Sequence, residues 1–250
     1  MMHIERTTDV WEYDGSYYGF LTVVYHAFKK NSFPEMILTP ETSVETLFLS
    51  EWIDTNEKIA KKMYERLVQR VRKENVQFIV EGFYCSLKNK ERCLLEAIYL
   101  ALTSKDLLTN HLGHPAILAL QKSIQALFSE VHLFTGFVRF EYIGTLLYSQ
   151  ITPKHFSLPF LCPHFARRYP NETLMIYDET HRLLAMIEQS HIRFIENTDP
   201  PAFQTHDSEQ DIQQNWRTFL QAVTIDERKN ERVQLSHLPK RFRGNMIDFQ

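Results

Sequence analysis

Three basic side chains lie close together in residues 158–169, a segment whose apolar spacing predicts a helix. His164, Arg167 and Arg168 occupy positions i, i+3 and i+4, so a helix places them on one face. Imidazole and guanidinium groups on one face are suited to hold a phosphate together. The alternative is a solvent-exposed helix face that binds nothing.

Residues 136–140 read Gly-Phe-Val-Arg-Phe and match the second half of the RNA-recognition-motif signature, whose strand aromatics stack on bases. The three preceding residues are not the basic residue, glycine and aromatic of the first half. A strand over 136–141 would place Phe137 and Arg139 on one face, where they would suit a nucleobase or a phosphate. Alternatively, Phe137 belongs to the core and Arg139 forms an internal ion pair.

Asp178 and His164 are the candidate acid and base of an enzyme. Asp178 ends a predicted strand at a hairpin corner, where a carboxylate could act as a general base. Base excision or hydrolysis needs such a carboxylate, or a polarised water, beside a nucleotide held in a pocket. The alternative is a turn role, because an aspartate at a turn usually accepts backbone hydrogen bonds.

The C-terminal segment mixes basic, amide and aromatic side chains. After Ile225 it has six basic residues against four acidic ones. Such a segment can follow a phosphodiester backbone, with cations supplying affinity and an aromatic ring supplying a stacking plane. Pro239 and Phe242 favour docking of this segment on the body of the protein. A segment that is merely solvated is the alternative. The candidate nucleic-acid-binding residues here are Arg228, Asn230, Lys240 and Arg241.

Signatures of several enzyme classes are missing. The sequence contains no GxGxxG, GxxxxGK[ST], GxSxG or HExxH string, and no CxxxCxxC cluster. The three cysteines, Cys85, Cys93 and Cys162, cannot all pair and are expected as small buried residues. His111 and His114 have no recognisable third ligand, and cap and loop roles explain both. We therefore expect neither a metal nor a cofactor.

The composition is that of a globular protein. The chain has 250 residues, 44% hydrophobic and 24% charged, with a formal net charge of −3 that does not favour nucleic-acid binding by the whole surface. No apolar run reaches the roughly 18 residues of a membrane span, and the N-terminus lacks a signal-peptide core. Because unpaired cysteines are typical of a reducing compartment, we expect a cytoplasmic protein without membrane contact.

The elements that would position the candidate residues indicate an α+β fold. The N-terminal half is helix-rich, and the C-terminal half combines a small antiparallel sheet with packed helices. A polar stretch at 104–113 is the expected hinge between the two halves. We therefore expect two domains, an N-terminal α/β region over residues 1–110 and a C-terminal α+β domain over 111–250. Sheet strands are predicted at 136–141, 146–152, 173–177 and 182–188.

Short strings follow one another in a specific order over residues 11–245. They are Tyr13-Asp14-Gly15-Ser16 with Gly19-Phe20-Leu21, Gly136 to Phe140, Pro153, His164-Phe165 with Arg168, Ile176-Tyr177-Asp178, Trp216, Ile225 with Arg228 and Asn230, Gln234, and Pro239-Lys240-Arg241. In this order they resemble a bacterial family described as DNA metabolism or DNA repair proteins, a domain of unknown function.

The resemblance implies a role in DNA repair or base modification. Members of that family are typically encoded beside a radical-SAM protein described as a DNA modification or repair enzyme, and some relatives are fused to a uracil-DNA-glycosylase-like region. We expect no such region in this sequence. The leading hypothesis is a DNA-binding accessory protein that presents DNA or a damaged base to the radical-SAM partner. The alternatives are a hydrolase or glycosylase using Asp178 and His164, and a protein-binding scaffold.

Overall fold

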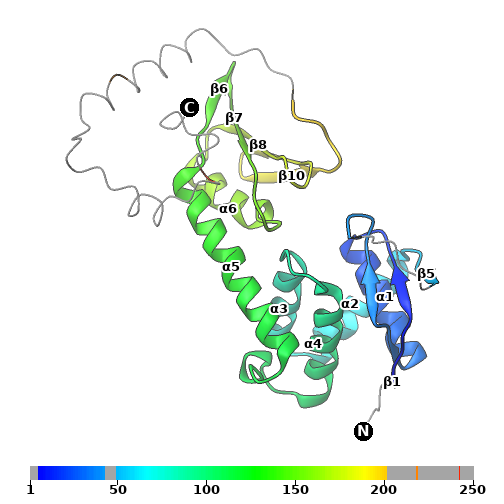
Figure 1. Ribbon diagram of the computed structural model, residues 1–250. Coiled ribbons are helices and arrows are strands. Elements are labelled where there is room, and N and C mark those ends of the chain that lie inside the picture. The colour runs from blue at the N-terminus through cyan, green and yellow to red at the C-terminus, as the bar shows by residue number, and fades with distance from the viewer. Residues whose placement is uncertain (1–4, 43–48, 202–217, 219–241, 243–250) are drawn as a thin grey trace. The chain divides into compact units, whose positions relative to one another are not determined.

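The computed structural model describes residues 5–42 and 49–201 and the single residues Thr218 and Phe242 (Figure 1). The chain divides into two compact units, Met1–Ala126 and Leu127–Gln250, and the division falls within helix α5 (Pro115–Phe137). The division expected at residues 110 and 111 lies earlier in the chain, just before α5.

Unit 1, Met1–Ala126, combines short parallel strands with a majority of helix. Strand β2 (Val10–Glu12) pairs in parallel with both β4 (Met36–Leu38) and β5 (Ser50–Trp52), while β1 (Glu5–Arg6) pairs in parallel with β3 (Ser32–Phe33). The helices before α5 are α1 (Tyr17–Lys30), α2 (Glu57–Arg70), α3 (Lys73–Phe83), α4 (Lys90–Ser104) and the 3-10 helix η1 (Leu108–Asn110). These helices confirm the predicted helix-rich N-terminal half.

Helix α1 is delimited by two polar residues whose chemistry suits their positions. The Ser16 hydroxyl accepts a hydrogen bond from the Gly19 N–H at 2.9 Å and so caps the N-terminus. Asn31 ends the helix in the left-handed region, with φ 52°, which Asn adopts more readily than most residues. Between them Phe20 and Leu21 are fully buried, so the helix fixes the segment before it against the core.

The described residues of unit 2 form a five-stranded sheet in the order β10-β9-β8-β7-β6, which confirms the predicted sheet and the α+β class. Its neighbouring strands are antiparallel except for β7 and β8. This pair departs from the expected antiparallel arrangement, because helix α6 (Leu158–Arg168) forms the crossover that parallel strands require. The strands are β6 (Glu141–Ile143), β7 (Leu146–Ile151), β8 (Thr173–Asp178), β9 (Leu183–Glu188) and β10 (His191–Ile195).

The core of unit 2 lies between this sheet and helices α5 and α6. Alternate residues of β7, Leu147 and Ile151 among them, are buried, and they belong to one cluster with Phe165 of α6 and Phe134 of α5. Strand alternation sends the intervening side chains of β7 to the opposite face of the sheet. The sheet therefore has one face closed by helices and a second face that these helices do not cover.

Residues 136–140 do not form the predicted strand. The first two of them end helix α5, the next three have no regular secondary structure, and β6 follows. The helix extends this far because Phe134 is buried in the core and Phe137 packs against it. The strand face that Phe137 and Arg139 were expected to share therefore does not exist.

Candidate nucleic-acid interface

The last turns of helix α6 carry the predicted basic face. The predicted helix is confirmed, and it places His164, Arg167 and Arg168 at the expected helical spacing. Both arginines are exposed, and no carboxylate of a described residue forms an ion pair with either of them. The Nε2 atom of His164 is buried, and no described residue forms a hydrogen bond with it. No ion pair within the described part of the fold therefore neutralises either arginine.

The positive charge of this turn affects the pKa of His164. Burial lowers the pKa of its imidazole, and the positive charges of Arg168 and Arg167 lower it further. A neutral imidazole between two guanidinium groups leaves the positive potential of the arginines in place. An anion bound by the arginines would offset their effect and raise the pKa of His164.

Aromatic contacts hold a second basic segment against the end of α6. The Phe140 ring lies edge-on to Phe165 and Tyr169, with centroid distances of 5.0 and 5.7 Å. The Arg168 guanidinium carbon lies 5.7 Å from the centroid of the Tyr169 ring. Because Arg139 directly precedes Phe140, these contacts bring its backbone to the same end of α6. The end of α6 and the loop that carries Arg139, remote in sequence, thus belong to one region.

Phe137 has a different role from the one expected of it. It is the last residue of α5, it is half-buried, and its ring lies 5.8 Å from that of Phe242. Phe242 is buried and also contacts Phe134, with a centroid distance of 4.8 Å. The interpretation of Phe137 as a core residue is the one the structure supports, and Phe242 docks on the body of unit 2 as expected.

The remaining candidates in the C-terminal segment, Arg228, Asn230, Lys240 and Arg241, lie outside the described residues. Of this part of the chain, the described residue Phe242 lies beside the last turn of α5.

Asp178 lies at the end of β8, fully buried, and its partner is not His164. One carboxylate oxygen accepts the backbone N–H of His181 at 3.0 Å, and the other lies 2.7 Å from Nδ1 of the same residue. The turn role is therefore confirmed, and an aspartate–imidazole pair is added to it. Sequence reasoning missed His181, although its place three residues after Asp178 in a predicted hairpin turn was a usable signal.

The surroundings of this pair are built by the loop between β7 and α6. The Phe156 ring lies edge-on to His181 at a centroid distance of 4.9 Å. Glu130 of α5 is buried and orders the loop by accepting hydrogen bonds from the His155 N–H at 2.9 Å and the Ser157 hydroxyl at 2.6 Å. Nothing local in the sequence indicates the role of Glu130, because its partners follow it by 25 and 27 residues, after strands β6 and β7. The pair therefore has a fixed orientation.

Neither a metal cluster nor the Cys162 thiol adds to the chemistry of the described residues. They contain no group of three or more His, Cys, Asp or Glu side chains that could hold a metal ion. Burial raises the pKa of Cys162 to about 12, and this thiol belongs to the core of unit 2. No described helix combines the length and the apolar character needed to cross a membrane.

Comparison with known proteins identifies a family. A family model for a domain of unknown function, DUF4130, matches residues 88–248, which include every described strand and helix of unit 2. No curated protein matches the chain.

Proposed function

The chain belongs to the DUF4130 family, a domain of unknown function, and we propose that it is an accessory protein of DNA repair or base modification. It binds DNA or a damaged base and works with a radical-SAM partner. Membership by itself assigns no activity. The residues that support DNA binding lie in unit 2, and the radical-SAM partner is proposed because the short sequence strings resemble those of a family encoded beside such proteins.

One observation carries the DNA-binding part of the proposal. Arg167 and Arg168 are exposed at the end of α6 and have no ion-pair partner among the described residues, while aromatic contacts bring the Arg139 segment beside them. Arginine side chains that an internal ion pair does not neutralise are free to bind phosphate. The Tyr169 ring lies beneath the Arg168 guanidinium and contacts Phe140, so it links this arginine to the Arg139 segment.

The test is a titration of labelled DNA, single-stranded and duplex, at two salt concentrations. Replacing both α6 arginines by glutamine should weaken binding and reduce the slope of log Kd against log salt by about 1 for each arginine that binds a phosphate. The control is Arg70→Gln, because Arg70 is also an exposed arginine in the last turn of a helix, α2. An unchanged affinity and slope in the double variant would contradict the proposal.

The partner is tested by co-purification with a radical-SAM protein of the kind that is encoded beside members of the resembled family. DNA binding is then measured for each protein alone and for the two together. We expect the complex to bind DNA more tightly than the partner alone. A stable complex in which this chain contributes no DNA affinity would instead favour the protein-binding scaffold.

A second candidate function, that of a hydrolase or glycosylase, is favoured by the Asp178–His181 pair. A buried carboxylate that bonds Nδ1 orients an imidazole and leaves Nε2 to act as a base, as in hydrolase triads. Incubation with DNA containing damaged bases tests this role. If the chain releases bases, His181→Ala should abolish release, whereas His191→Ala, at an exposed histidine of β10, should not. Release that survives His181→Ala would exclude the pair as its source.

A further inference from the structure

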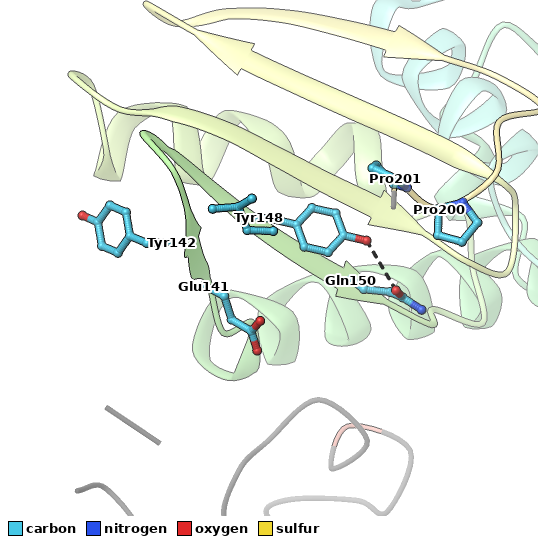
Figure 2. A pocket seen from close by; sticks show the side chains of 7 residues that line it. Glu141, Tyr142, Tyr148, Gln150, Pro200 and Pro201 are labelled. Atoms are coloured by element: carbon cyan, nitrogen blue, oxygen red, sulfur yellow. Dashed lines mark hydrogen bonds between the residues drawn. The ribbon is translucent and has the colours of Figure 1, made fainter. Parts of the chain in front are cut away.

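A pocket opens on unit 2 at the edge of the sheet. It is a hollow of about 170 Å³, bounded by β6, β7 and two consecutive prolines that follow β10. Figure 2 shows Tyr148 with its hydroxyl toward Gln150, and Pro200 and Pro201 beside them. The residues that line it are Glu141, Tyr142, Ile143, Tyr148, Gln150, Pro200 and Pro201.

The walls of the pocket come from the sheet face that helices α5 and α6 do not cover. Tyr148 and Gln150 alternate with the buried residues of β7, and Glu141 is paired with Tyr148 across the two strands. The Tyr148 hydroxyl donates a hydrogen bond to Oε1 of Gln150 at 3.4 Å. Burial raises the pKa of Tyr148, and the charge of Glu141 contributes to the increase. Tyr148, Gln150 and Glu141 therefore line one space.

The chemistry of these walls suits a flat, polar-edged ring. Tyr148 and the prolines offer flat apolar surfaces for the face of a ring. The Gln150 amide carries both donors and acceptors, and the Glu141 carboxylate accepts hydrogen bonds. A nucleobase has this combination of an apolar π-face and an edge of donors and acceptors, and enzymes that bind extruded bases use stacking together with hydrogen bonds to that edge.

The pocket adjoins, along the chain, the segment that reaches the proposed phosphate-binding region. Glu141 directly follows Phe140, which contacts Phe165 and Tyr169 at the end of α6. The pocket and the arginines lie on opposite faces of the sheet near the edge strand β6. A DNA strand carries both bases and phosphates, so one strand could reach both regions by passing around this edge.

We propose that this pocket receives one unstacked nucleobase of a DNA strand whose phosphates lie on the arginines of α6. This inference rests on the proposed DNA-binding function. It adds the ligand class, an unpaired base, and assigns the stacking surface to Tyr148 and base-edge recognition to Gln150 and Glu141.

The experiment compares two labelled duplexes that differ at one position. One carries a single bulged nucleotide and the other carries an abasic site in its place, so only the first offers an unpaired base. The intact protein should bind the bulged duplex about tenfold more tightly, which is the effect of stacking one base on one aromatic ring. Repeating the titration with each of the four bulged bases measures whether the pocket distinguishes base edges.

Three variants assign the effect to the pocket. Tyr148→Ala should remove the preference for the bulged base and leave the affinity for the abasic duplex unchanged. Gln150→Leu, of similar size, keeps the stacking surface and should reduce discrimination among the four bases. The control is Phe194→Ala, because Phe194 is an exposed aromatic of the distant edge strand β10 and does not line the pocket.

The outcomes separate this inference from the proposed function. Equal affinity of the intact protein for both duplexes overturns the base pocket while leaving DNA binding in place. Binding of neither duplex overturns both. A preference that persists in Tyr148→Ala, with the fold verified by circular dichroism, also overturns the assignment. Arg168→Ala should lower both affinities by the same factor, because it acts on phosphate and not on the base.

Discussion

Two polar segments, one that precedes helix α1 and one at the end of helix α6, are used in opposite ways. In unit 1, the segment before α1 uses its polar groups internally: Tyr13 donates to Glu91 at 3.0 Å, and Asp14 accepts from the Thr55 hydroxyl at 2.6 Å. In unit 2, the end of α6 presents Arg167 and Arg168 without an ion-pair partner among the described residues. Both segments contribute residues to the sequence resemblance. Of these side chains, only Arg167 and Arg168 lack a hydrogen-bond or ion-pair partner among the described residues.

In a family without a known activity, structural and functional polar residues can be separated by whether they have a partner within the fold. A buried polar group with its partners in place stabilises the fold, and removing it costs stability. An exposed cation without a partner costs little to remove. Stability and ligand binding should therefore respond in opposite ways to substitutions in the two segments.

The largest effect on stability is expected at Gly19. A Cβ there would lie 2.2 Å from Oδ1 of Asp14 and 2.8 Å from Cδ2 of Tyr13, so the bonded Asp14 carboxylate would have to move. We expect Gly19→Ala to lower the free energy of unfolding by about 1–3 kcal/mol, as overpacking does. Chemical denaturation measures it. Gly113→Ala is the control, because nothing lies within 4 Å of a Cβ at that position; equal losses in both variants would contradict the close approach.

A somewhat smaller loss is expected for Tyr13→Phe. Burial first, and then the charge of Glu91, raise the pKa of Tyr13, so the phenol is a neutral donor to a buried carboxylate. Removing the donor should cost about 1.5 kcal/mol, the usual value for a hydrogen bond to a charged group. Tyr64→Phe, at an exposed tyrosine of α2, should leave the denaturation midpoint unchanged. A midpoint for Tyr13→Phe equal to that of the intact protein would show that the bond contributes nothing.

The contrast between the two segments is sharpest at Arg168. Because it is exposed and has no ion-pair partner among the described residues, Arg168→Ala should change the free energy of unfolding by less than about 0.5 kcal/mol. The same variant should weaken binding in the titration of labelled DNA. A large loss of stability would show that Arg168 is a structural residue, and the contrast would fail.

The smallest effect is a change in one titration. Burial lowers the pKa of His164, and the positive charges of Arg168 and Arg167 lower it further. Replacing both arginines by glutamine should therefore raise the pKa of His164 toward, but not fully to, the value of about 6.5 of an unperturbed histidine. Imidazole proton shifts in NMR spectra measure it, with exposed His191 as the reference. An unchanged value would mean that the arginines do not act on this site.

The same shift has a consequence for stability in acid. The pKa of His164 is lower in the folded than in the unfolded chain, so protonation favours unfolding. The stability that the neutral imidazole contributes is complete above the pKa of His164 in the unfolded chain, near pH 6.5. It is lost as the pH falls through the lower pKa of His164 in the folded chain. The double glutamine variant should lose less stability over this range than the intact protein.

Local patterns predicted several elements and one part of the site. Helical spacing located the helix over residues 158–169 and the shared position of its three basic residues. The turn from Asp178 to His181 followed from two strand-like runs that flank a polar tetrad. These predictions hold because each depends on contacts between residues near one another in sequence.

Other features could not be read from the sequence. The Gly-Phe-Val-Arg-Phe string has strand-forming residues, but Phe137 ends helix α5 because its ring packs against Phe242, which lies far along the chain. Local strand propensity does not decide the secondary structure where a side chain distant in the sequence completes the core.

The sequence alone determined the α+β class, the basic face of α6 and the hairpin turn, because periodicity and turn chemistry act over a few residues. Tertiary structure decided which polar groups are bonded internally and which remain available. It bonded Asp14 to Thr55 and Tyr13 to Glu91, and it left Arg167 and Arg168 exposed. The physical reason is that a polar group's availability depends on the partners that folding brings to it, and most of those partners come from other elements.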